Sequence, residues 1–252
     1  MYLSEPLNSN SPTSKIDLDI QERISLLEQA EKIRTELLRR RSKRKIDTYY
    51  PDSGPLRREL YIKHCLFFRA GAIHRERCFM AANRIGKSEG VGAYETTLHL
   101  TGQYPYWWEG RRFNYGINAW AAGKDSKTTR EIVQLKLLGR TGDFGTGMIP
   151  ADCIIATTPK PGVPEGIESI VVRHTSGTKS RIVLKSYDQG RESFQGTELE
   201  VIWLDEECDL DLYLECLTRT MTTQGLTICT FTPLLGMSAL ARYFLDIKPA
   251  ET

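Results

Sequence analysis

The stretch Met80–Ser88 carries residue types that could bind a phosphate group. It follows a short apolar run and ends in Gly86-Lys87-Ser88. A glycine at this point lets the backbone approach phosphates, the lysine reaches the β and γ phosphates, and the serine hydroxyl is a ligand for Mg²⁺. The usual motif begins with glycine where this chain has Ala81, so a surface turn with an exposed lysine remains the alternative for this segment alone. The predicted nucleotide-binding residues are Ala82, Asn83, Arg84, Ile85, Gly86, Lys87 and Ser88.

A second polar cluster, Asp205-Glu206-Glu207, directly follows the apolar run that begins at Leu199. The run shows no alternation, which predicts a strand buried on both faces, and such strands end at the edge where ligands bind in open α/β sheets. We predict that Ser88 and Asp205 hold Mg²⁺, Asp205 through the water shell, and that Glu206 orients and polarises the attacking water. Solvated acids at a strand end are the alternative, but they would not explain the phosphate-type loop about 120 residues earlier.

Two threonines, Thr230 and Thr232, lie at the end of the apolar run Leu226–Phe231. This run predicts a strand beside the one that carries Asp205. A threonine there can cap a turn, or it can sense the γ-phosphate and transmit its loss as movement. Upstream of the loop, Tyr61 and His64 are candidates for an adenine pocket, although packing is the commoner role of both types.

The remaining pattern predicts the elements that must position these groups. Helical and strand-like segments alternate, which indicates an α/β fold with a mainly parallel sheet flanked by helices. Two β-branched runs around Gly177 predict an antiparallel hairpin added to that sheet. We expect helices at 57–70, 88–100, 124–138, 209–221 and 238–245, strands at 78–80, 113–121, 169–174, 180–186, 199–204 and 226–231, and irregular chain at 149–166.

The N-terminal part differs in composition from the rest. Residues 1–14 are polar and predict a disordered tail. Residues 15–56 predict a helix with a basic end, Arg39–Lys45, and a linker, and the phosphate-loop domain is expected at 57–252. The basic run is either a solvated helix end or a contact with DNA phosphates or an acidic partner; both interpretations remain open.

The overall composition is that of a globular chain. Of 252 residues, 40% are hydrophobic and 26% charged, and the formal net charge of +2 does not by itself indicate a nucleic-acid-binding protein. The six cysteines form no C-x-x-C pair, which favours buried free thiols in a reducing cytoplasm over disulfides or zinc ligands. No segment is typical of a signal peptide or a membrane span, so we expect a soluble intracellular protein.

Taken together, these segments resemble the large terminase subunit of tailed double-stranded DNA phages, most closely the branch of short-tailed, headful-packaging phages. The resemblance spans about residues 60–245 and is carried by 76–88, 98–105, 186–191, 203–207, 217–220 and 230–238. It implies an ASCE-type (RecA-like) P-loop ATPase core in which Ala81 is tolerated, with Glu206 as the catalytic glutamate and Thr230 and Thr232 in the coupling motif. It also implies a catalytic role for Lys87 and a switch role for Arg84. An arginine finger acting on the neighbouring subunit is implied too; Arg140 is the candidate, with Arg112 and Arg130 as alternatives.

The resemblance implies a motor that hydrolyses ATP with Mg²⁺ and moves double-stranded DNA into a procapsid in the host cytoplasm. The implied partners are DNA, the portal protein, the small terminase subunit and further copies of the chain in a ring, a pentamer by resemblance; the fragment alone could also be a monomer. Because family members carry a C-terminal nuclease beyond this point, we expect no DNA cleavage from this chain. The alternatives are another nucleic-acid-stimulated P-loop ATPase of helicase type and a non-catalytic nucleotide-binding module.

Overall fold

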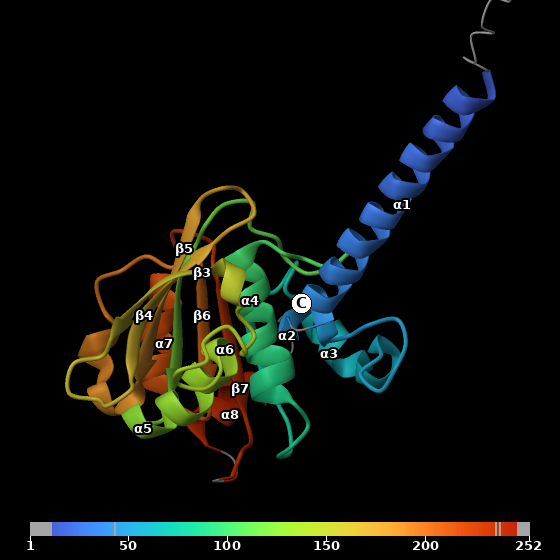
Figure 1. The fold of residues 1–252 in the computed structure, drawn as a ribbon. Helices are drawn as coiled ribbons and strands as arrows, with labels where there is room; N and C mark the ends of the chain where they lie inside the picture. Colours follow the sequence, from blue (N-terminus) through green and yellow to red (C-terminus); the bar gives the residue numbers. More distant parts are fainter. Residues whose placement is uncertain (1–11, 43, 235, 237, 246–252) are drawn as a thin grey trace, which may run out of the picture. The chain divides into compact units, whose positions relative to one another are not determined.

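The computed structural model describes residues 12–42, 44–234, 236 and 238–245 (Figure 1). The chain divides into two compact units, residues 1–43 and residues 44–252. The first unit contains one long helix, α1 (Pro12–Ser42), so Pro12–Ser14 of the predicted tail are helical. The rest of that tail, residues 1–11, and the side chains of the basic run from Arg39 to Lys43 lie outside the described part of the chain.

The second unit is built on a seven-stranded sheet in the order β1-β7-β6-β2-β5-β4-β3. The first five strands in that order run parallel, β4 pairs antiparallel with β5, and β3 pairs antiparallel with β4 at the edge. This confirms the predicted α/β class with a hairpin addition. The strands are β1 (Glu76–Met80), β2 (Asn118–Gly123), β3 (Ile154–Pro159), β4 (Ile167–Arg173), β5 (Lys179–Ser186), β6 (Val201–Asp205) and β7 (Leu226–Phe231).

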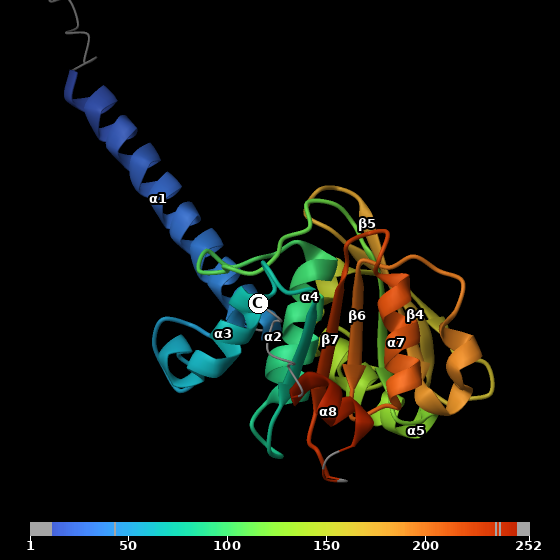
Figure 2. The ribbon, with the colours of Figure 1, turned by 180° about the vertical axis from the view of Figure 1, so that it is seen from behind.

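Helices cover both faces of the sheet (Figures 1 and 2). The phosphate-loop helix, α3 and α6 pack on one face, and α7 and α8 pack on the other. The helices are α2 (Lys45–Thr48), α3 (Ile62–Ala70), α4 (Tyr94–Thr101), α5 (Ser126–Thr128), α6 (Leu135–Leu138), α7 (Leu210–Arg219) and α8 (Ala239–Leu245). Two π-helical segments, Lys87–Ala93 and Thr129–Gln134, lead into α4 and α6, and single 3₁₀ turns occupy Arg58–Tyr61, Ala151–Cys153, Tyr187–Gln189 and Arg191–Phe194.

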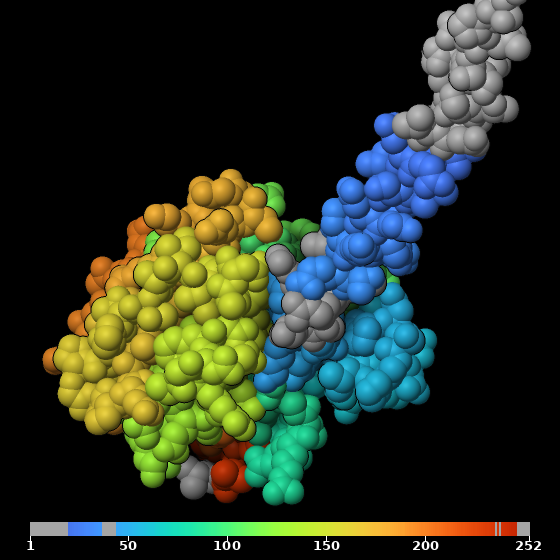
Figure 3. All heavy atoms as spheres, in the orientation of Figure 1, coloured from blue at the N-terminus to red at the C-terminus, as the bar shows by residue number. Residues whose placement is uncertain are grey.

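The central strands β6 and β7 are buried at every position. This explains their continuous apolar sequences, because side chains on both faces of a sheet covered by helices must be removed from water. In the space-filling view, the yellow-green chain between β2 and β4 forms much of the surface over the sheet (Figure 3). The strands that end at Asp205 and Phe231 thus run through the interior of this unit.

Some predicted boundaries are wrong. Residues 149–166 were expected to be irregular, but β3 lies there as an edge strand; most of its side chains are exposed and it ends at Pro159, so its sequence lacks the apolar alternation of a strand. The strand expected at 113–121 begins only at Asn118, because Phe113 and Ile117 are buried from an irregular segment.

The compact unit begins at Arg44, whereas the predicted linker ran to residue 56. Ile46 and Tyr50 are both nearly fully buried, and Tyr50 packs against a cluster of aromatic rings that includes Phe68 and Tyr94. The aromatic stretch around Trp107 and Trp108 packs in the same core. Residues 44–61 thus belong to the compact unit and line the space beside the loop Ala81–Gly86.

Candidate active site

The loop Ala81–Gly86 connects β1 to the helix that begins at Lys87. Its two residues with positive φ are Arg84 (+65°) and Gly86 (+85°). Ala81 has an ordinary backbone conformation, which explains why alanine can stand where the usual motif has glycine. Lys87 is only 6% exposed and its Nζ donates to Asn83 Oδ1 at 3.3 Å. The lysine side chain is therefore buried and hydrogen-bonded to a residue of its own loop.

The carboxyl group of Asp205 lies at the carboxyl end of β6, 1% exposed. Thr230 Oγ1 donates to Asp205 Oδ1 at 2.7 Å, and Trp203 Nε1 donates to Thr230 Oγ1 at 2.8 Å. Burial raises the pKa of Asp205 to about 6, although hydrogen bonds from Thr230 and Ser88 oppose that rise. The aspartate is thus held in one orientation against Ser88 of the phosphate loop.

The two glutamates that follow Asp205 have different surroundings. Glu207 accepts a hydrogen bond from the Ser238 hydroxyl. The Glu206 carboxylate has no hydrogen bond or ion pair to any residue that the structure describes, and Glu206 has a φ of +67°. Of the two, Glu206 therefore has its carboxylate available to a ligand.

The two threonines of β7 and its end occupy different places. Thr230 is fully buried, and its hydroxyl donates a hydrogen bond to Asp205. Thr232 Oγ1 lies 2.8 Å from Ala81 O and 3.0 Å from Asn83 Oδ1, the same amide oxygen that accepts from Lys87. The end of β7 is thereby connected both to the acidic strand and to the phosphate loop.

A cavity of about 240 Å³ adjoins the loop. Tyr61 and His64 line it together with Arg84, Ile85 and Gly86, so both aromatic candidates from the sequence lie beside the loop. His64 is also a packing residue: its Nδ1 lies 2.8 Å from the Tyr50 hydroxyl, and burial lowers its pKa. Sequence reasoning missed the other aromatic walls, Tyr49 and Tyr50, because they lie in the segment assigned to the linker.

Glu89, two residues after Lys87, collects three partners. It accepts from the Tyr49 hydroxyl and forms ion pairs with Lys45 and with Lys136. Burial alone would raise the pKa of Glu89, but the hydrogen bonds from Lys136, Lys45 and Tyr49 outweigh it and lower that pKa to about 2. Glu89 thus fixes the start of the phosphate-loop helix to two separate segments.

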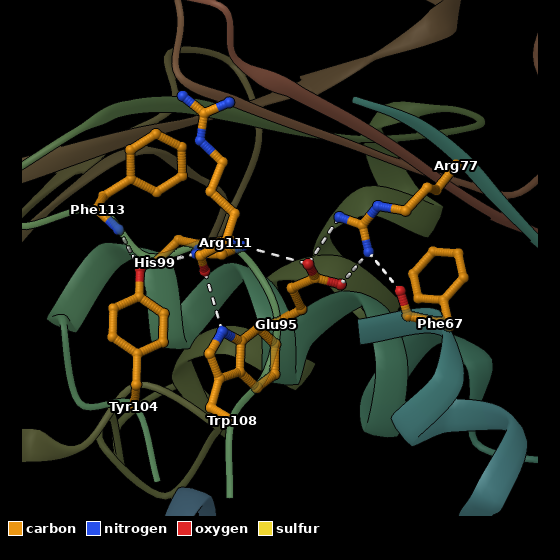
Figure 4. A network of polar contacts seen from close by, with 8 residues as sticks. All are labelled: Phe67, Arg77, Glu95, His99, Tyr104, Trp108, Arg111 and Phe113. Carbon is orange, nitrogen blue, oxygen red and sulfur yellow. Dashed lines mark hydrogen bonds and ion pairs between the residues drawn. The ribbon is translucent and has the colours of Figure 1, made fainter. Parts of the chain in front are cut away.

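A buried ionic network joins β1 to α4 on either side of the loop (Figure 4). Arg77 contacts both oxygens of Glu95 at 2.7 and 3.1 Å, and His99 Nε2 lies 3.3 Å from Glu95 Oε1. His99 Nδ1 lies 2.9 Å from the Tyr104 hydroxyl, which accepts from the Phe113 amide. Burial would raise the pKa of Glu95, but the charge of Arg77 lowers it below its ordinary range. Only the fold reveals this network, since its members are dispersed in the sequence.

The three arginines considered for an intersubunit role are dispersed. Arg112 donates to Trp108 O and Arg130 donates to Pro164 O, so both are engaged within the chain. The Arg140 side chain is exposed in a loop with three positive-φ glycines and has no hydrogen bond to the described residues. The structure does not bring it into contact with Lys87 or Asp205.

The described residues contain neither a metal-binding cluster nor a membrane-spanning helix. In that part of the chain, no three His, Cys, Asp or Glu side chains group closely enough to hold a metal ion by themselves. No helix among the same residues is long and apolar enough to cross a membrane.

Comparison with known proteins identifies the family of this chain. The model of the N-terminal part of the T4-like-virus type of terminase large subunit matches residues 78–250. The chain belongs to the large terminase subunit family. That match begins inside β1 and includes the phosphate loop, Asp205, Glu206 and both threonines.

Individual terminases differ in how far they match. The large terminase subunit of Salmonella phage P22 is 37% identical over 205 residues, which are 73% of this chain and 41% of that relative. The chain thus spans less than half the length of that relative. Two solved structures are similar as well. One is a large terminase from a thermophilic bacteriophage (12% identity, TM-score 0.49, covering 68% of this chain and 37% of that one). The other is a mutant ATPase domain of the Thermus phage P74-26 large terminase (15% identity, TM-score 0.46, covering 68% and 64%).

Proposed function

We propose that this chain is the ATP-hydrolysing motor part of a terminase that moves double-stranded DNA into a procapsid. One observation carries the proposal: Lys87, Asp205 and Glu206 converge at the carboxyl ends of the adjacent parallel strands β1, β7 and β6 in a chain of the large terminase family. This is the edge at which open α/β sheets bind ligands.

The loop supplies the phosphate-binding groups. Lys87, already inside the loop, carries the positive charge for the β and γ phosphates, and the amides of Ala82–Ser88 at the helix start favour an anion. Arg84 is exposed on the same loop and adds a second positive charge, which suits the proposed switch role. The neighbouring 240 Å³ cavity accommodates the base.

Ser88 and Asp205 fit a Mg²⁺ ion. Asp205 is a buried carboxylate whose pKa is raised to about 6 by burial, and a cation beside it would restore its charged form. In nucleotide sites of this type, phosphates and water provide most magnesium ligands, so a cluster of protein carboxylates is not required. The bound ion would neutralise charge on the β and γ phosphates.

Glu206 is the residue proposed to orient the attacking water. Its carboxylate follows directly on Asp205 and, unlike that of Glu207, is not held by another side chain of the described chain. A carboxylate there can accept a proton from water as the water attacks the γ-phosphorus in line.

The end of β7 suits a coupling role. Thr232 shares Asn83 Oδ1 with Lys87, so a phosphate that draws the lysine away changes the partners of an oxygen to which Thr232 is bonded. Thr230 responds to the state of Asp205 in the neighbouring strand. Loss of the γ-phosphate would therefore be felt by β7 and the segment after it.

The remaining parts of the proposal concern the assembly. DNA, the portal protein, the small terminase subunit and further copies of this chain in a ring are the proposed partners, and the host cytoplasm is the proposed location. Arg140 is the proposed arginine finger that acts on the neighbouring subunit, because it is exposed and free of the intrachain bonds that engage Arg112 and Arg130.

The test is ATP hydrolysis by the purified chain with and without DNA and portal-bearing procapsids. Lys87→Ala should abolish hydrolysis and weaken nucleotide binding. Glu206→Gln should keep Mg·ATP binding, seen as a raised melting temperature, while turnover stops. Glu207→Gln is the matched control and should retain activity. A Glu206→Gln protein with wild-type turnover would rule out the assignment.

A further inference from the structure

The hydroxyl of Tyr187 lies beside the ends of two strands, β2 and β6. Tyr187 directly follows β5, and its Oη lies 2.9 Å from Asp205 O, 3.2 Å from Glu206 O and 3.4 Å from Ala122 O at the end of β2. A phenol has one proton to donate, and the shortest contact is with Asp205 O. The side chain therefore reaches past β2 to hold the point at which β6 ends.

That point has an unusual backbone. Glu206 has a φ of +67°, in the left-handed region that favours glycine over residues with a Cβ. On its other side, the Glu206 amide donates to Thr230 O of β7 at 3.0 Å. Residues 205 and 206 are thus bonded on two sides, to β7 through the hydrogen bond of the Glu206 amide and to the β5 side through the Tyr187 hydroxyl.

Tyr187 is itself held rigidly. Its ring packs against the core cluster formed with α7 and α8. The turn that carries it is closed by a capping box in which Ser186 and Gln189 exchange hydrogen bonds.

We propose that Tyr187 is a positioning residue for ATP hydrolysis, which aims the Glu206 carboxylate through its hydrogen bond to the Asp205 carbonyl from the β5 side, next to the Glu206 carbonyl. The proposal rests on the proposed function, because it needs Glu206 to orient water. Tyr187 contacts no reacting atom; it acts through the direction in which the backbone presents Glu206.

A matched control separates positioning from simple packing. Tyr213 belongs to the same core cluster against which the Tyr187 ring packs, but its hydroxyl donates to Glu76 Oε2 at 2.9 Å and has no hydrogen bond to residues 205–206. Tyr187→Phe and Tyr213→Phe remove the same hydroxyl from the same cluster. A general loss of packing or stability would affect both variants alike.

The experiment measures steady-state ATP hydrolysis of the whole chain and the affinity for a fluorescent ATP analogue. Tyr187→Phe should lower kcat by roughly ten- to a hundredfold, the usual effect of losing a group that orients a functional side chain, with KM and analogue affinity unchanged. Tyr213→Phe should keep the wild-type kcat. Rates are divided by the number of nucleotide sites titrated in the same preparation, so that any loss of folded protein does not enter the comparison.

The outcomes distinguish the positioning role from the proposed function. If the wild-type chain binds nucleotide but shows no hydrolysis alone or with DNA and procapsids, the proposed function fails. If the wild type hydrolyses ATP and Tyr187→Phe keeps its kcat, or loses only as much as Tyr213→Phe, the positioning role is overturned while the proposed function stands. A change confined to KM would also overturn it, because it would place the tyrosine in substrate binding.

Discussion

Replacing Thr230 by valine should destabilise the protein in a pH-dependent way. Valine has nearly the shape of threonine, so the change removes the hydroxyl and leaves the packing of β7 in place. Two bonds are lost together: the one donated to Asp205 Oδ1 at 2.7 Å and the one accepted from Trp203 Nε1 at 2.8 Å. Both Asp205 and Trp203 are buried, so water cannot replace the lost hydroxyl.

The magnitude follows from the two partners. A buried N–H left without an acceptor costs about 1–3 kcal/mol, and a bond to a charged acceptor contributes about 1.5–3 kcal/mol, compared with about 0.5–1.5 kcal/mol for a neutral one. The pKa of Asp205 is raised from 3.8 to about 6, so its contribution to stability is fully present below pH 3.8 and is lost as the pH rises through about 6. Without the Thr230 hydroxyl, that pKa rises further, and the penalty above pH 6 grows by about 1–2 kcal/mol because a bond to a charged acceptor is lost in place of one to a neutral acceptor.

Urea unfolding in EDTA without nucleotide measures this directly, since no cation then compensates Asp205. Thr230→Val should lower the free energy of unfolding by about 2–4 kcal/mol at pH 5 and by about 1–2 kcal/mol more at pH 8. Thr227→Val is the control: this threonine is equally buried in β7, but its hydroxyl has only a 3.5 Å contact with Thr220. An equal loss at both pH values, or a loss no larger than that of the control, would refute the reasoning.

Two further predictions concern the supports of the site. Glu95→Gln should destabilise the chain by about 3–5 kcal/mol in urea unfolding, because it leaves the charge of Arg77 buried without its counter-charge; the exposed Glu168→Gln is the control, and comparable losses in both would count against the network. Arg140→Ala should leave nucleotide affinity of the isolated chain unchanged and stop ATP hydrolysis only in the procapsid-bound assembly. Wild-type packaging by that variant would remove Arg140 as the intersubunit arginine.

Much of the fold could be predicted because burial leaves a local pattern. The central strands β6 and β7 are apolar throughout, since helices cover both faces, and β-branched runs around a glycine indicate the hairpin of β4 and β5. The edge strand β3 could not be predicted in this way, because an edge strand that is largely exposed needs no apolar side chains.

The sequence by itself determined which groups of this protein could do chemistry: Gly86-Lys87-Ser88 after one strand and Asp205-Glu206 after another, each with the residue types that phosphate and magnesium require. Only the tertiary structure decided how those groups are held. Tyr187 contacts Asp205, Lys45 and Lys136 contact Glu89, and Arg77 contacts Glu95, and in each case the partners are well separated along the chain. Such contacts leave no periodic trace in a sequence, because they depend on which strand ends and helices the sheet order brings together.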